Sequence, residues 1–239
     1  MNQTMTIRFA CLGLVLLLAL SAPAGAGPYE DGVSAYRLGN YARALAFFRP
    51  LAEAGDARGQ NALGNLYAAG VAVPRDLDLA AKWYRRSAEQ DFAPGQSSLG
   101  FMYENGHGLP KDIAKAMQWY RRAADQGFAQ AEYNLGLIYM NGREVPPDDA
   151  EAIKWYALAA EQDFAKAQFE LGRMTADGRG VKQNLVQAYK WLYLAADQHH
   201  VVAASLQRKL AAYMKPPEIA EATRLADEWR AAHPKPTLP

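Results

Sequence analysis

The chain has 239 residues, half of them hydrophobic, and its 26 basic and 25 acidic residues leave a formal net charge of +1. This near balance excludes a general electrostatic attraction to nucleic acids or anionic membranes. The length suits either one sizeable domain or an array of repeats.

Residues 1–26 are predicted to be a secretory signal peptide. Arg8 precedes an apolar run from Phe9 to Leu20, and small residues in an A-x-A pattern then favour cleavage after Ala26. A run of roughly 12 apolar residues is too short to cross ~30 Å of hydrocarbon as a helix, so no stable membrane anchor is expected after cleavage. Cys11, the only cysteine, lies in this leader. The mature chain therefore has no thiol for a disulfide, a metal site or a nucleophile.

Residues 27–56 are predicted to form an N-terminal capping half-repeat. Ala44 and Phe47 lie 36 residues before Ala80 and Trp83 of the unit that follows. The turn is shortened to Gly39-Asn40, which indicates a compact first unit.

Four units of 36 residues follow without a gap, at residues 57–92, 93–128, 129–164 and 165–200. The stretch "KWYRRSAEQDF" recurs in them as "QWYRRAADQGF", "KWYALAAEQDF" and "KWLYLAADQHH". Its tryptophans are Trp83, Trp119, Trp155 and Trp191. The same step relates the pairs Leu63-Gly64, Leu99-Gly100, Leu135-Gly136 and Leu171-Gly172. Such regular self-similarity predicts a repeat architecture.

Each unit is predicted to contain two helices. In the third unit, Ala131, Leu135 and Ile138 fall on one helical face. A glycine ends each first helix, at Gly70, Gly106, Gly142 and Gly178. A capping residue opens each second helix, at Asp76, Asp112, Asp148 and Asn184.

The Trp-Tyr-Arg-Arg stretch raises the question of whether its rings bind a nucleic acid or pack in the core. The tryptophan recurs three residues after an alanine in every unit, which favours packing. Arg85-Arg86 is replaced by Ala157-Leu158 in the third unit, so the arginines are interpreted as a solvated face or as stems over the rings. A glycine within a helix costs about 1 kcal/mol relative to alanine. The glycine after each leucine therefore predicts a close contact with the neighbouring helix.

Residues 201–232 are predicted to form C-terminal capping helices. The stretch "AASLQRKLAAYM" indicates one helix, and Pro216-Pro217 opens another. An end repeat needs such a cap, because its stacking face would otherwise be exposed to water. Residues 233–239 are predicted to be a disordered tail.

The repeated pattern resembles the Sel-one-like repeat, a relative of the tetratricopeptide repeat. The shared motif is "A-x-x-x-L-G-x-x-Y-x-x-G-x-G-V-x-x-D-x-x-x-A-x-x-W-Y-x-x-A-A-x-Q-G", and residues 57–200 supply four copies. Departures are mild: Ala72 and Glu144 replace the second glycine, and the fourth unit has Thr175 and Leu192. The resemblance implies an all-α fold, a right-handed α/α superhelical solenoid of four 36-residue helix-turn-helix repeats with N- and C-terminal capping helices.

The resemblance also implies a scaffold or adaptor that binds other proteins or peptides. Stacked helix pairs form a superhelix whose first helices line a concave groove. The outward stripe of these helices supplies the candidate partner-binding residues: Arg58, Asn61, Asn65, Phe101, Glu104, Tyr133, Leu137, Met140, Lys166, Phe169 and Arg173. The apolar members between the second and fourth units suit an extended peptide or a helix. The alternative is that these side chains pack between neighbouring repeats.

The sequence contains no convincing catalytic, metal-binding or cofactor motif. Its histidines lack metalloprotease spacing, and "GQSSLG" differs from the G-x-S-x-G of a nucleophile elbow. The resemblance includes exported, cysteine-rich relatives associated with β-lactam binding or hydrolysis, but the mature chain lacks their cysteines and an S-x-x-K motif. We therefore predict a non-enzymatic scaffold of the cell envelope, periplasmic or secreted, with a protein or peptide partner and no cofactor. The alternatives are a cell-wall or β-lactam-acting hydrolase and a secreted factor that engages host proteins.

Overall fold

The computed structural model describes residues 27–142 and 144–234. The predicted signal peptide and residues 235–239 of the predicted tail lie outside the described residues.

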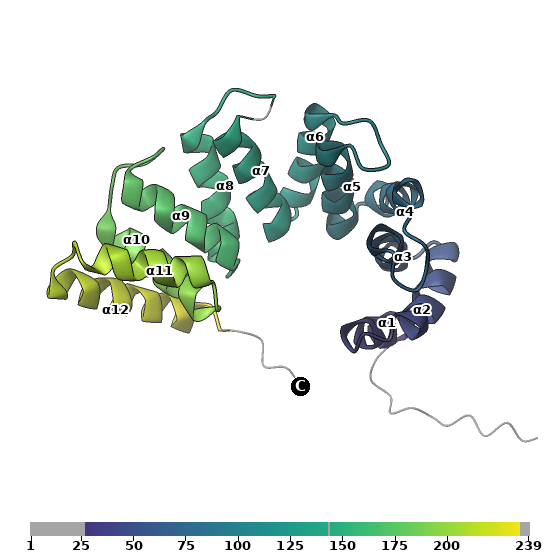
Figure 1. The fold of residues 1–239 in the computed structure, drawn as a ribbon, viewed down its shortest axis with the longest axis horizontal. Coiled ribbons are helices and arrows are strands. Elements are labelled where there is room, and N and C mark those ends of the chain that lie inside the picture. The colour runs from purple at the N-terminus through teal and green to yellow at the C-terminus, as the bar shows by residue number, and fades with distance from the viewer. Residues whose placement is uncertain (1–26, 143, 235–239) are drawn as a thin grey trace, which may run out of the picture.

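The described residues form twelve α-helices joined by short links and turns. Their bounds are α1 Pro28–Arg37, α2 Tyr41–Glu53, α3 Ala57–Ala69, α4 Leu77–Glu89, α5 Ala93–Asn105, α6 Ile113–Ala124, α7 Ala129–Asn141, α8 Asp149–Glu161, α9 Ala165–Asp177, α10 Leu185–Asp197, α11 Val201–Ala211 and α12 Pro216–Ala232. From α1 to α11 successive helices pack against each other, α12 packs on α10, and the stack curves into an open arc (Figure 1). The predicted all-α superhelical solenoid is thus confirmed.

The predicted helix ends are present in all four repeats. The side chain of Asp76 accepts a hydrogen bond from the backbone N–H of Leu79, and Asp112, Asp148 and Asn184 cap α6, α8 and α10 in the same way. At the other end, Gly70 has φ +70°, a left-handed conformation that glycine adopts at little cost. These local signals fix the 36-residue register of the array.

In the first three repeats the helical glycine lies against a tyrosine ring of the partner helix, whereas Gly172 of the fourth lies against Leu192. A Cβ atom on Gly136 would lie 2.5 Å from the ring of Tyr156, and one on Gly100 would lie 2.8 Å from that of Tyr120. The predicted close helix–helix contact is therefore present. In these three repeats the tyrosine directly follows the tryptophan, and Tyr120 and Tyr156 are fully buried.

The prediction that all four repeat tryptophans are core residues is wrong for three of them. Trp83, Trp119 and Trp155 are half-buried and pack at the edge of the hydrophobic clusters. The guanidinium carbon of Arg86 lies 4.7 Å from the Trp83 ring centre, as expected for arginine stems over the rings. Trp191 is buried, because Trp229 of α12 packs against it with ring centres 5.9 Å apart.

A ladder of buried amides connects each repeat to the next. The side chain of Gln96 donates to the carbonyl of Ala88 and accepts from Gln126 at 2.8 Å. Gln60 and Gln168 make the equivalent bonds in the first and fourth repeats. The third repeat has Glu132 at this place, and its carboxyl accepts from Gln162 at 2.7 Å. These bonds satisfy polar groups that would otherwise be buried without partners.

Candidate functional site

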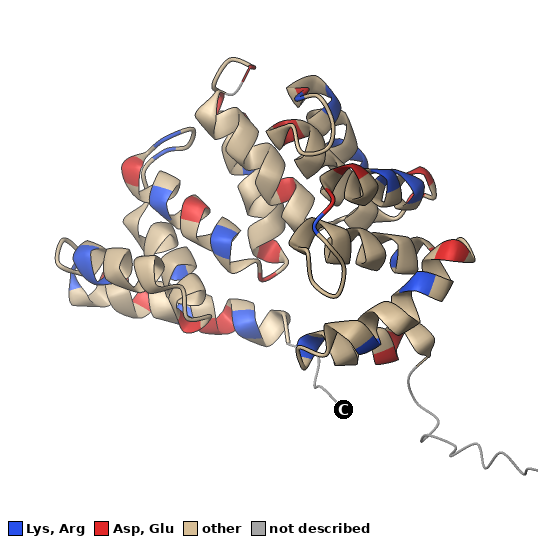
Figure 2. Cartoon of the chain, turned by 45° about the vertical axis from the view of Figure 1, so that its right-hand side comes forward, with Lys and Arg blue, Asp and Glu red and all other residues tan. Residues whose placement is uncertain are grey.

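A groove with a volume of about 820 Å³ lies on the face formed by α3, α5 and α7. The repeat fold explains its position, since the glycine and leucine columns of these helices point to the second helices and leave the opposite stripe free. Figure 2 shows that charged residues of both signs are distributed along the helices of the array.

Six of the eleven predicted partner-binding residues line this groove. They are Asn61, Asn65, Phe101, Tyr133, Leu137 and Lys166. The groove therefore lies over the first three repeats, with Lys166 as its contribution from the fourth. The binding site predicted between the second and fourth units overlaps this groove in its second and third repeats and stays a prediction.

Phe101 is the most open apolar side chain of the groove, with 48% of its surface exposed. Its ring meets that of His107 edge-on, with centres 5.8 Å apart. Tyr133 is more enclosed, since its ring lies 5.7 Å from Tyr156 and 5.4 Å from Phe164. Phe101 thus has the accessibility that partner binding needs, whereas Tyr133 forms part of the wall.

Burial raises the pKa of the Tyr84 and Tyr133 hydroxyls. Both stay protonated at neutral pH and can donate hydrogen bonds. The Tyr84 hydroxyl donates to Oδ1 of Asn65 at 2.8 Å. This bond orients a carboxamide at the N-terminal end of the groove.

The other five predicted residues lie outside the groove, and four of them have structural contacts on its flanks. The Arg58 guanidinium pairs with Glu30 at 3.3 Å and lies over the Tyr29 ring, which ties α3 to α1. The Glu104 carboxylate accepts from the Tyr120 hydroxyl at 2.8 Å. These contacts belong to packing between helices.

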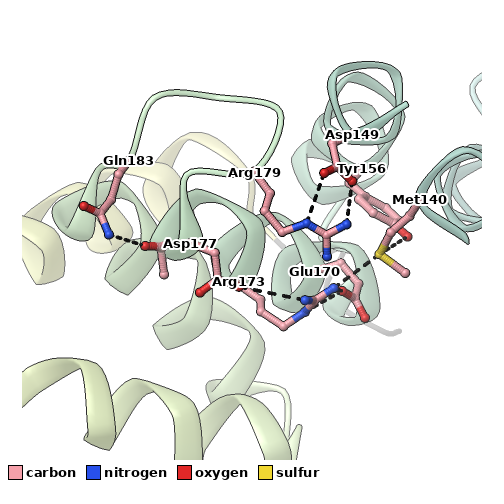
Figure 3. Close-up of polar contacts among 9 residues, drawn as sticks. Met140, Asp149, Tyr156, Glu170, Arg173, Asp177, Arg179 and Gln183 are labelled. Atoms are coloured by element: carbon pink, nitrogen blue, oxygen red, sulfur yellow. Dashed lines mark hydrogen bonds and ion pairs between the residues drawn. The ribbon is translucent and has the colours of Figure 1, made fainter. Parts of the chain in front are cut away.

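Met140 and Arg173 belong to a polar cluster between the third and fourth repeats (Figure 3). A guanidinium nitrogen of Arg173 lies 2.6 Å from the Glu170 carboxylate and 3.2 Å from the Met140 sulfur. Beside it, Arg179 forms two hydrogen bonds with Asp149, at 2.6 and 3.1 Å. The cluster fixes the angle between α8 and α9.

Phe169 is the fifth residue outside the groove, and it stacks on His200 with ring centres 4.7 Å apart. Phe169 thus packs at the junction between the fourth repeat and the C-terminal helices. His200 also accepts a hydrogen bond from the backbone N–H of Ala203 and so caps α11.

Sequence reasoning missed several groove residues. Ser98 and Asn134 lie on α5 and α7 one position beyond the chosen stripe, where the repeats vary between Ala62, Ser98, Asn134 and Glu170. That variation was an available signal. Arg75 and His107 come from the links, whose course helical periodicity does not define.

The described residues contain no cluster of three or more His, Cys, Asp or Glu side chains placed to hold a metal ion. Within the same part of the chain, no helix combines the length and the apolar character that a membrane span requires.

Comparison with known proteins identifies the repeat. The family model described as Sel1 repeat matches residues 25–56, 57–92, 93–128, 129–164 and 165–200. The first match covers the segment predicted as a capping half-repeat, which contains the complete helix pair α1 and α2. No curated protein matches the sequence significantly.

Solved structures with the same fold include three bacterial proteins. A protective antigen of uropathogenic Escherichia coli with an SLR fold is 28% identical, with a TM-score of 0.73. The match covers 84% of this chain and 46% of that protein, so the chain spans less than half of its relative's length. A Sel1 repeat protein from Oxalobacter formigenes is 32% identical over 70% of this chain and 69% of that one, with a TM-score of 0.60. A putative Sel1 repeat protein from Klebsiella pneumoniae is 21% identical, with a TM-score of 0.56 and coverage of 77% and 91%, and shows the fold alone.

Sel1 repeat proteins are in general scaffolds for protein interactions and are typically not enzymes. The matched segments cover most of the chain, and their 36-residue units coincide with helix pairs of the structure. The chain therefore belongs to the Sel1 repeat family.

Proposed function

We propose that the protein is a non-enzymatic scaffold of the cell envelope that binds a segment of a partner protein in the groove over α3, α5 and α7. One observation carries this proposal: the groove is lined by side chains that differ between repeats, whereas the packing columns recur. Equivalent positions hold Asn65, Phe101, Leu137 and Arg173. Surface positions that the packing of the repeats does not fix can vary, and they can therefore give specificity for a ligand.

The open shape of the groove agrees with a peptide ligand. It combines an exposed ring at Phe101 with neighbouring carboxamides at Asn61 and Asn65. Extended peptides bind through main-chain hydrogen bonds and through pockets for their side chains.

The envelope location rests on the leader predicted for residues 1–26. The description of the Escherichia coli relative as a protective antigen agrees with export. A protease-protection assay on intact and permeabilised cells tests this part independently of binding.

Binding in the groove is tested with a pair of exposed apolar residues. Phe101, 48% exposed, lines the groove, while Leu158, 51% exposed, lies on α8 outside it. Peptides selected from a display library against the full chain should bind Phe101→Ala at least about tenfold more weakly, a loss of about 1.4 kcal/mol. They should bind Leu158→Ala as tightly as the wild type. Equal affinity for both variants would locate the binding surface elsewhere.

A further inference from the structure

We propose that the groove accepts an extended, acidic segment of its partner protein. This inference rests on the proposed function, because it names the chemistry of the segment that the same groove would bind. Two independent observations carry it: the charges along the groove and the orientation of its carboxamides.

The permanent charges of the groove are positive. Arg75 enters from the link between α3 and α4, and Lys166 from the first turn of α9, while none of the described residues that line the groove is an aspartate or a glutamate. Neither cation forms an ion pair within the described part of the chain. The Arg75 Nε donates to the carbonyl of Ala68 at 3.2 Å, which orients the guanidinium. In a chain with a net charge of only +1, this is a local excess of positive charge.

Two carboxylates close to the groove are engaged by other groups. Glu170 pairs with Arg173 at 2.6 Å, and Glu104 accepts from the Tyr120 hydroxyl at 2.8 Å. Arg173 therefore partly offsets the negative charge of Glu170, and the Tyr120 hydroxyl occupies one acceptor of Glu104. Carboxylates of a ligand would be attracted to Arg75 and Lys166.

The three asparagines of the groove present donors to a ligand. The side-chain oxygen of Asn61 accepts from the Ser98 hydroxyl at 3.1 Å, that of Asn65 from Tyr84 at 2.8 Å, and that of Asn134 from Gln130 at 3.0 Å. Each carboxamide oxygen is therefore engaged by a neighbouring side chain, and its NH₂ group has no hydrogen-bond partner within the described residues. A matching ligand supplies acceptors.

An acidic peptide combines both properties. Its main-chain carbonyls can accept from the asparagine NH₂ groups, its carboxylates can meet the cations, and an apolar side chain can pack on Phe101 and Leu137. A nucleic acid fits less well, because phosphate backbones are held by many basic side chains and this groove has two permanent cations.

Short fluorescent peptides test the proposal by anisotropy against the full chain. Three sets share the same apolar positions and carry acidic, amide or basic residues elsewhere. All are acetylated and amidated, so that terminal charges do not contribute. Two further probes are the amide set with a free C-terminal carboxylate and an oligogalacturonate, an anionic sugar.

Acidic peptides are expected to bind most tightly. A higher salt concentration should weaken the binding of the acidic peptides more than that of the amide peptides. The double variant Arg75→Gln with Lys166→Gln should bind the acidic peptides about tenfold more weakly than the wild type and the amide peptides about equally well. Lys182→Gln with Arg208→Gln is the control, because it removes the same charge from exposed residues outside the groove.

The contrary outcomes separate this inference from the proposed function. Tight binding of amide peptides that Phe101→Ala abolishes would preserve the groove and overturn its acidic preference. A requirement for the free C-terminal carboxylate, or binding of the sugar alone, would overturn it as well. Failure of every peptide set to bind, while the repeats remain folded by circular dichroism, would count against the proposed function itself.

Discussion

Glu132 departs from the buried amide ladder in a way that affects stability. It is only 3% exposed, and its burial raises the pKa of the carboxyl above its usual range. Gln60, Gln96 and Gln168 at the equivalent positions donate to a backbone carbonyl. A carboxylate cannot donate this bond.

We expect Glu132→Gln to stabilise the protein by about 1 kcal/mol at neutral pH, because it supplies the missing donor. The folded pKa is raised, so the folded state binds the proton more tightly than the unfolded state. Wild-type stability should therefore rise as the pH falls through the folded pKa, and the advantage of the variant should shrink. Urea unfolding from pH 7 to pH 5 measures this difference. The converse change Gln96→Glu should introduce the same defect in the second repeat, and a constant difference between Glu132→Gln and the wild type would contradict the explanation.

The error over the tryptophans also belongs to the residue scale. Trp119 and Tyr120 recur with the same step, so periodicity alone cannot decide which of two adjacent side chains faces the partner helix. The structure shows which of the two rings packs against the helical glycine. At Gly100 it is the ring of Tyr120.

At the scale of the helices, the sequence was sufficient to predict features that depend on a single residue and its adjacent backbone. Capping aspartates and left-handed glycines gave the helix ends correctly, because their effects depend on the backbone next to them. The groove was only partly predictable. Arg75 lines the groove because of the path of the link between α3 and α4. Phe169 lies outside the groove, where its ring stacks on His200. Both depend on contacts between segments that a helical wheel does not include.

The helical glycines also allow a test of packing between paired helices. Gly136→Ala should destabilise the protein despite the better helix propensity of alanine, because its Cβ would lie 2.5 Å from the buried Tyr156 ring. Overpacking costs about 1–3 kcal/mol, against a propensity gain of about 1 kcal/mol. In a Tyr156→Ala background the same change should become stabilising. A double-mutant cycle by thermal unfolding measures the coupling, and additive effects would show that the two residues do not compete for space.

At the scale of the whole array, the buried apolar residues of the described chain form separate clusters that follow one another along the stack. Each repeat is stabilised mainly by its neighbours. The C-terminal end depends on α12, where Trp229 packs on Trp191 and donates to the Glu161 carboxylate at 2.6 Å. Damage at this end should therefore remain local.

Trp229→Ala tests this local character. Removing a buried tryptophan costs about 3–5 kcal/mol, and the loss should fall on the helices that it covers, α8 and α10. Hydrogen exchange should show protection reduced in α8 to α12 and nearly unchanged in α2 to α4. Arg224→Ala is the matched control on the same helix, because its ion pairs are with Glu221 and Glu228 of α12. If protection fell equally along the array, the repeats would unfold as one cooperative unit. The groove over α3, α5 and α7 would then depend on the far end of the stack, whereas independent repeats would allow it to keep its shape.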